Sequence, residues 1–232
     1  MPSRGLSEGT VLHNKASPHM FPTLLRLGRC KMMIDLHCHS KYSHDNHLEP
    51  AELIERAIKS GLNGVCFTEH FSFDSSWPIE RMSRPASFLV LRGVEVSTDS
   101  GHLLVYGVED DSWNRWGRNN YLNLVKVLDS VHALGGICIP AHPFRGWESL
   151  GEKIFSIPGL DAIETHNGVN DRHQNQPAVE AAWKLGLPAT GGSDCHQLIQ
   201  VGRAYTEFDN PIETMADLIR EIKAGNCRGR IY

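Results

Sequence analysis

Two histidines separated by one residue, His37 and His39, follow a short apolar run at 32–34. If that run is a strand, its side chains alternate between two faces, so both imidazoles point the same way. Two imidazoles on one face suit a divalent metal such as zinc or manganese. His44 and Asp45 follow within reach of a loop. One His-x-His pair alone leaves two interpretations open, a metal site or two histidines that share a soluble loop.

Similar polar residues end other apolar runs along the chain. We expect strands near residues 32, 63, 90, 136, 160 and 188, and each of them ends in His, Asp or Glu. The residues at these ends are His37 and His39, His70, Glu95, His142, His166 with Asn167, and Asp194 with His196. In parallel α/β folds, sites gather at the carboxyl ends of the strands. The pattern therefore predicts one shared site and disfavours separate core or loop histidines.

His102 departs from this pattern, because it stands at the front of the apolar run 101–107 instead of at its end. Its spacing fits a half-buried strand histidine as well as a metal ligand. The donors at the strand ends are nitrogen and oxygen atoms, and they outnumber the ligands that one four-coordinate metal accepts. We therefore expect two or three divalent metal ions, with a carboxylate as a bridge.

The segments between these strand ends have the pattern of helices. Residues 49–61 are amphipathic, with Pro50 in the first turn and Gly61 as the C-cap. A strand at 64–67 follows, and strand, helix and strand in this order make a βαβ unit, which implies a parallel sheet. Further helices are expected near 119–134, 174–186 and 211–225, and a last short strand at 201–208. The chain is therefore predicted to have an α/β fold.

The composition excludes several other classes of protein. A chain of 232 residues can bury the core of one α/β barrel domain. Its net charge of −4 does not indicate nucleic-acid binding by the chain as a whole. No apolar run approaches the roughly 18 residues of a membrane span. The six cysteines are scattered and form no C-x-x-C pair, which is typical of reduced thiols and indicates a cytoplasmic protein. The oligomeric state stays open.

Residues 1–31 differ from the rest of the chain. They hold five basic residues against one acid, Glu8, and show no clear hydrophobic period. The segment 21–25 is too short for the core of a signal peptide. We expect a disordered or non-native leader, with Met32 or Met33 as the natural start, and a single domain over 32–232.

Residues 71–87, between two expected strands, hold three large aromatic residues, Phe71, Phe73 and Trp77. Two interpretations are open for this segment: a mobile lid over a site, or a surface loop held in place by its aromatic side chains. The sequence favours neither.

The motifs, taken together and in order, resemble the PHP family, named for polymerase and histidinol phosphatase. The resemblance covers about residues 32–208. It rests on Asp-Leu-His-Cys-His-Ser at 35–40, Phe-Thr-Glu-His at 67–70, Gly-Val-Glu-Val-Ser at 93–97, Gly-His-Leu-Leu at 101–104, Ala-His-Pro at 141–143 and Gly-Ser-Asp-Cys-His at 192–196. The family implies a distorted (β/α)7 barrel with a di- or trinuclear metal site at the C-terminal ends of the strands.

The resemblance also implies a set of metal ligands shared among three metals. The first metal would take His37, His39, Glu95 and Asp194, the second would share Glu95 and add His102 and His142, and the third would take Asp45, His70 and His196. For the early loop ligand of the third metal, Asp45 is preferred and His44 is the alternative. The resemblance thus makes His102 a ligand where its spacing left the question open.

The chemistry that the resemblance implies is phosphoester hydrolysis. Adjacent divalent metals, Zn, Mn or Fe, lower the pKa of a bridging water, so that a metal-bridged hydroxide exists at neutral pH and no Ser or Cys nucleophile is needed. The expected substrate is a small phosphorylated metabolite or a nucleotide. One alternative is exonuclease-like cleavage of nucleic-acid ends, which a basic track of Arg81, Arg84 and Arg145 would favour. Another is a non-catalytic metal-bound module with a structural or partner-binding role, which the near-complete ligand set disfavours.

Four residues are candidates for binding the substrate. Arg145, three residues after His142, is placed to grip a phosphate with paired donors, although a surface arginine fits equally well. Arg203, after the Asp-x-His tip, is a weaker candidate. His166 and Asn167 lie at another strand tip, where they contact the substrate or support the structure.

Overall fold

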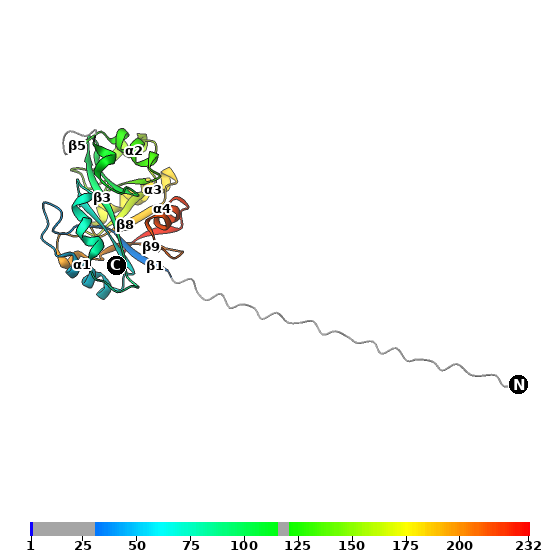
Figure 1. Cartoon of the computed structure of the whole chain (residues 1–232). Coiled ribbons are helices and arrows are strands. Elements are labelled where there is room, and N and C mark those ends of the chain that lie inside the picture. Colours follow the sequence, from blue (N-terminus) through cyan, green and yellow to red (C-terminus); the bar gives the residue numbers. More distant parts are fainter. Residues whose placement is uncertain (2–30, 116–120) are drawn as a thin grey trace.

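The computed structural model describes Met1 and residues 31–115 and 121–232 (Figure 1). The expected leader at 1–31 therefore lies outside the described residues, apart from its first and last residue. Within the described ranges, no helix combines the length and the apolar character that crossing a membrane requires.

Strands and helices alternate along the chain, except that β4 directly follows β3. The strands are β1 (Met32–Cys38), β2 (Gly64–His70), β3 (Leu89–Thr98), β4 (Gly101–Tyr106), β5 (Tyr121–Leu122), β6 (Ile137–Pro140), β7 (Ile163–Asn167), β8 (Ala189–Gly192), β9 (Ala204–Phe208) and β10 (Cys227–Ile231). The α-helices are α1 (Pro50–Lys59), α2 (Leu124–Ala133), α3 (Arg172–Leu185) and α4 (Met215–Lys223). Short 3-10 helices are η1 (Asp74–Arg81), η2 (Asp111–Asn114), η3 (Gly151–Ser156) and η4 (Leu198–Gln200). The predicted elements are present, although the helices predicted from 119 and 211 begin later than expected.

The strands form one curled sheet and a two-stranded partner (Figure 1). The order in the larger sheet is β10-β9-β1-β2-β3-β4-β6, with β5 on β3, and β7 pairs with β8. β1, β2 and β3 are parallel, whereas β4 and β9 run antiparallel to their neighbours. β8 returns to β1, because Asp194 N donates to His37 O at 2.7 Å and Cys38 forms a parallel bridge with Cys195. The α/β class is confirmed, but the exact (β/α)7 arrangement is not.

Local sequence signals set the ends of the helices. Pro50 begins α1, where its missing N–H costs nothing, and Gly61 follows the helix with a φ of 79°. In α3, the Asp171 side chain accepts a hydrogen bond from Gln174 N in a capping box, and Gly186 ends the helix in the left-handed conformation. The helices predicted at 49–61 and 174–186 are confirmed.

Three clusters of buried apolar side chains hold the sheet and the helices together. One of them joins β1, β4 and β6 to α4, and each large aliphatic side chain buried there contributes about 1.5–3 kcal/mol. Within it, the buried Tyr106 hydroxyl of β4 donates to Leu36 O of β1 at 2.8 Å. This bond ties β4 to β1 at the residue before His37.

The segment 71–87 packs against the sheet. The guanidinium of Arg92 in β3 lies 4.1 Å from the centre of the Phe73 ring. It donates to Phe73 O and Ser76 Oγ, at 3.0 Å each, and pairs with Glu80 of η1. These contacts support the interpretation of a loop held by its aromatic residues rather than that of a mobile lid.

Candidate metal centre

Four side chains meet where β1 ends. His37 and His39 lie at the end of β1, Glu95 lies in β3 and Asp194 follows β8. The Nε2 atoms of His37 and His39 are 3.0 Å apart, and they lie 3.2 Å and 3.1 Å from Glu95 Oε2. Asp194 Oδ1 lies 3.5 Å from His37 Nε2 and 3.3 Å from His39 Nε2. Since all four side chains are buried, their donor atoms enclose one buried point.

Glu95 turns its second oxygen to a further pair of imidazoles. Its Oε1 lies 2.9 Å from His102 Nδ1 and 3.1 Å from His142 Nε2. β4 runs antiparallel to β3, so the first residues of β4 lie beside the last residues of β3, and His102 pairs with Ser97. His102 therefore reaches the same edge as the ends of the parallel strands, although it stands at the front of its own run. Glu95 lies between the two groups, as a bridging carboxylate would.

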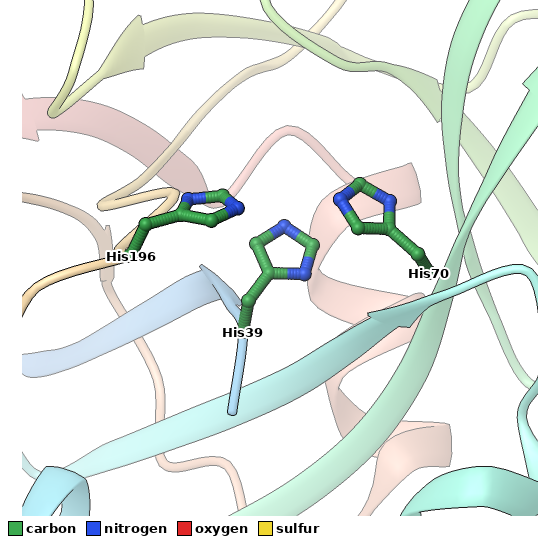
Figure 2. Close-up of side chains that lie close together, drawn as sticks. All are labelled: His39, His70 and His196. Carbon is green, nitrogen blue, oxygen red and sulfur yellow. The ribbon is translucent and has the colours of Figure 1, made fainter. Parts of the chain in front are cut away.

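A third group consists of Asp45, His70 and His196. Asp45 Oδ2 lies 3.1 Å from His196 Nε2 and 3.4 Å from His70 Nε2. Figure 2 shows the His39 ring between the other two rings, with its centroid 4.3 Å from that of His70 and 4.9 Å from that of His196. His44 is exposed, and its ring centroid lies 5.6 Å from that of His70. The contacts support Asp45 rather than His44 as the early loop ligand.

The distances between donor atoms are compatible with a metal between them. Nitrogen atoms bound at about 2.1 Å to one tetrahedral metal lie about 3.4 Å apart. The imidazoles and carboxylates of the first two groups lie 2.9 to 3.5 Å from one another where they face each other. Three sets of donors, each with its ligand atoms within 4.8 Å, are formed by His39, His70 and His196, by His37, His39 and Glu95, and by Glu95, His102 and His142. Imidazole and carboxylate donors suit zinc, manganese and iron.

The charges of the centre favour a cation within it. Burial lowers the pKa of His37, but the carboxylates of Asp194, Glu164 and Glu95 outweigh this effect and raise that pKa well above its ordinary value. Burial also opposes protonation of His39, yet its bonds to Asp194 and Glu95 raise its pKa to about 10. Burial raises the pKa of Glu95, and the surrounding imidazoles hold it well below its usual range. Buried carboxylates require a positive partner, and a divalent ion would take the place of the imidazole protons.

Two carboxylates that the motifs did not single out contact the ligand candidates. Glu164 Oε1 lies 2.9 Å from His37 Nδ1, and its Oε2 accepts a hydrogen bond from His142 N at 2.6 Å. Glu148 Oε2 lies 3.2 Å from His102 Nε2. Such partners fix the orientation of a ligating imidazole. Glu164 sits in the apolar run of β7, where an unpaired carboxylate is costly to bury, and this signal could have found it.

The four candidates for substrate binding fall in two places. Arg145 Nη2 donates to Asp194 and, at 2.9 Å, to Asn167 Oδ1, and Asn167 Nδ2 donates to Asp194 Oδ2 at 3.2 Å. Arg145 and Asn167 thus lie in the centre with the metal-ligand candidates. His166 instead packs against β10, and Arg203 lines a neighbouring cavity. The structure does not bring these two residues into contact with the centre.

Backbone strain is concentrated around the centre. In the described parts of the chain, the non-glycine residues with a positive φ are Phe71, His142, Glu148 and Asp194. Two of them are ligand candidates, Phe71 follows His70, and Glu148 contacts His102. Such conformations cost about 1–3 kcal/mol each and persist where the surrounding structure imposes them. Their location around the centre indicates that some folding stability is lost in order to hold these side chains at the centre.

The approach of β8 to β1 depends on a missing side chain. A Cβ atom at Gly192 would lie 2.5 Å from His37 N and would collide with the Cβ of His37. Glycine therefore lets the two strands approach closely. This approach brings Asp194, two residues later, to His37 and His39.

Comparison with family models agrees with the motifs. Residues 35–139 match the model described as PHP domain, and residues 172–227 match the model described as PHP-associated. The first match includes the His-x-His pair, His70, Glu95 and His102, and the second includes Asp194 with His196.

The chain is also similar to individual proteins. It is 26% identical over 207 residues to a Thermotoga maritima protein named "Probable histidinol-phosphatase", a match that covers 75% of this chain and 89% of that one. PsfC from Pseudomonas syringae has a solved structure with a TM-score of 0.68 at 20% identity, and the match covers 87% of this chain and 92% of that one. The lesion-specific endonuclease PfuEndoQ from Pyrococcus furiosus gives the same TM-score and identity over 86% of this chain and 57% of its own. These two structures show a shared fold.

Proposed function

The chain belongs to the PHP domain family of metal-dependent phosphoesterases, and from this premise we propose that it hydrolyses a phosphate ester of a small metabolite or a nucleotide. It is a hydrolase that acts on phosphoester bonds. The observation that supports the proposal is the arrangement of three groups of donor atoms around Glu95. We also propose that the domain is a distorted (β/α)7 barrel, as the family resemblance implies, and the curled sheet supports this proposal.

The proposed ligands would hold two or three divalent ions of zinc, manganese or iron: His37, His39, Asp45, His70, Glu95, His102, His142, Asp194 and His196. When bound, such ions activate water for attack and neutralise the phosphate oxygens as charge builds. The chain itself sets the spacing of the donors and buries those of the first two groups. Glu164 orients the His37 ring and the backbone of His142, and Glu148 orients the His102 ring.

Arg145 is the residue best placed to bind the phosphate. Its Nε and Nη2 groups are held by Asn170, Asn167 and Asp194. Its Nη1 group makes no hydrogen bond with the described residues, and the side chain is 29% exposed. The guanidinium is therefore fixed in place with donors left for a substrate oxygen.

The centre is open to solvent on the side of the third group. The side chains of Asp45 and His196 are 38% and 35% exposed, whereas those of His37 and Glu95 are buried. We infer that the substrate enters from this side.

The test combines metal analysis with a panel of mononucleotides, bisphosphates, histidinol phosphate and short oligonucleotides. We expect phosphate release, and we expect His70→Ala and Asp194→Asn to lower kcat/KM by more than about 100-fold, because partners of metal ligands alone are worth 10–100-fold. Circular dichroism should show both variants folded. The matched control is His132→Ala on α2, where the ring lies 2.8 Å from Asp161 and away from the centre. Phosphate release that is unchanged in both ligand variants would rule the proposal out.

The two alternatives have less support. Arg84 lines a cavity together with Met32 and Leu89, the first residues of β1 and β3, at the edge of the sheet opposite to the centre. Arg84 therefore does not form a basic track with Arg145. Such a track would have favoured the cleavage of nucleic-acid ends. A non-catalytic module is disfavoured because a decayed site would have lost donors. The oligonucleotides in the panel test the first alternative directly.

A further inference from the structure

A buried carboxylate outside the set of metal-ligand candidates contacts the loop that follows β1. Glu69, in β2, is fully buried and immediately precedes His70. Its Oε1 accepts a hydrogen bond from the Ser40 hydroxyl and its Oε2 accepts one from the Ser43 hydroxyl, each at 2.5 Å. The Ser40 backbone N–H donates to both oxygens, at 3.2 Å and 3.0 Å. In all of these contacts the Glu69 carboxylate is the acceptor, as an ionised carboxylate must be.

The Ser43 hydroxyl also contacts two metal-ligand candidates. Its oxygen lies 3.2 Å from His39 Nδ1 and accepts a hydrogen bond from His70 N at 3.1 Å. Ser43 is only 3% exposed, so water does not compete for these bonds. A hydroxyl has one proton to donate and two lone pairs that accept. The three partners of Ser43 therefore use its whole hydrogen-bonding capacity.

The Glu69 carboxylate decides the direction of these bonds. If the Ser43 proton turned to His39 Nδ1, two acceptor oxygens, those of Ser43 and Glu69, would face each other 2.5 Å apart without a proton between them. Such an arrangement is costly in a buried place. The Ser43 proton is therefore donated to Glu69, and the hydroxyl oxygen accepts the N–H of His39 Nδ1.

This bond leaves Nε2 as the nitrogen of His39 whose lone pair can bind a metal. His39 Nε2 is the atom that faces the centre, 3.0 Å from His37 Nε2. It also lies 3.1 Å from Glu95 Oε2 and 3.3 Å from Asp194 Oδ1. A neutral imidazole carries its proton on one nitrogen and binds a metal through the other. A proton on Nε2 would instead present an N–H to the cation.

The other imidazole at the end of β1 is oriented in a different way. Glu164 contacts His37 Nδ1 directly, at 2.9 Å. The Nδ1 atom of His39 faces a hydroxyl, which can donate or accept equally well. A hydroxyl selects one tautomer of its neighbour only when a third group fixes the hydroxyl proton, and Glu69 is that group.

We propose that Glu69 and Ser43 are positioning residues that set the tautomer of His39 and thereby the affinity of the centre for a divalent metal. The inference rests on the proposed function only because that function requires a metal centre, and it holds for any substrate. His39 belongs to two of the three donor sets, so its tautomer affects both of them. Glu69 acts through Ser43, as partners of ligating histidines do.

The test compares Ser43→Ala with a matched control, Ser40→Ala. Both side chains are buried and both donate to Glu69, but the Ser40 hydroxyl accepts from Tyr42 N, at 3.4 Å, instead of from a ligand candidate. Competition with a chromophoric chelator measures the affinity for Zn²⁺. Ser43→Ala should weaken Zn²⁺ binding by about 10–100-fold, whereas Ser40→Ala should bind Zn²⁺ as the unaltered protein does. Equal affinities of the two variants would overturn the inference.

A second measurement needs no variant. Heteronuclear NMR of the zinc-loaded protein, with labelled histidine nitrogens, should place the proton of His39 on Nδ1. A proton on Nε2 would contradict the inference even if Ser43→Ala failed to fold.

The outcomes separate the inference from the proposed function. If the two variants differ in Zn²⁺ affinity as expected but no phosphate ester is hydrolysed, the inference stands and the proposed function fails. If the unaltered protein hydrolyses a phosphate ester and the two variants bind Zn²⁺ equally well, the function stands and the inference fails. An unaltered protein that binds neither Zn²⁺ nor Mn²⁺ would overturn both.

Discussion

Replacement of Glu164 by glutamine is expected to weaken metal binding without removing any ligand. In the structure, the Glu164 carboxylate faces three donors: His37 Nδ1 at 2.9 Å, His142 N at 2.6 Å and Asn167 Nδ2 at 3.1 Å. The residue is only 1% exposed, so water cannot replace a lost bond. A single buried carboxylate thus serves one residue from each of the first two metal groups.

The size of the expected loss in metal affinity follows from the number of hydrogen-bond acceptors on the side chain at position 164. A carboxylate has two acceptor oxygens, whereas an amide has one acceptor and one donor group. Glu164→Gln therefore leaves either the His37 ring or the His142 N–H facing another donor. A buried polar group without its partner costs about 1–3 kcal/mol, and every 1.4 kcal/mol is tenfold in affinity. We expect metal affinity to fall by about 10–100-fold, the range found for such partners of metal ligands.

Metal content after dialysis against buffered Zn²⁺ or Mn²⁺, together with calorimetric titration, measures this loss directly. The control is Glu180→Gln, which makes the same chemical change on the exposed face of α3. A metal affinity of Glu164→Gln equal to that of the control would refute the assignment of Glu164 as the residue that orients His37.

Three further changes test other parts of the structure. Gly192→Ala should lower the free energy of unfolding by about 1–3 kcal/mol, because the new methyl group overlaps His37, and it should also lower the metal content. Urea unfolding measures the first effect and metal analysis the second. An unaffected metal content would contradict the explanation given for the close approach of β8 to β1. Thr214→Ala removes the side chain that caps α4 and should cost about 1 kcal/mol of stability with kcat/KM unchanged, so altered kinetics would show that α4 influences the centre. Removal of the metal with a chelator should abolish turnover and lower the Tm measured by calorimetry by about 5–10 °C. A ligand at 100 times its Kd adds about 2.7 kcal/mol to the free energy of unfolding, and each kcal/mol changes Tm by about 2–4 °C in a chain of this size. A Tm and activity that EDTA leaves unchanged would argue against a metal centre.

His102 illustrates what strand direction adds to a sequence pattern. At the start of an apolar run it resembled a structural histidine, since the other donors all follow their runs. β4 is antiparallel to β3, so its first residues lie at the edge where the parallel strands end. Strand direction is decided by pairing between segments and has no local signature in the run itself.

His166 and Glu164 illustrate the opposite case, in which two neighbours in one strand go to different places. The histidine packs against β10, while the carboxylate two residues earlier contacts His37. The register of β7 and β8 shifts between these two positions. Such an irregularity changes which side chains share a face, and simple alternation along the run could not reveal it.

The sequence by itself determined the kinds of donor, their places after apolar runs and the ends of most helices, because these are properties of neighbouring residues. The family resemblance already made Glu95 a bridge between two groups, but only the tertiary structure decided how far apart the donors lie and that Glu164 and Glu148 contact them. Those facts depend on contacts such as that between His37 and Glu164, 127 residues apart, and on the closure of β8 onto β1. Contacts of this range form only when the whole sheet curls, so no single stretch of the chain contains them.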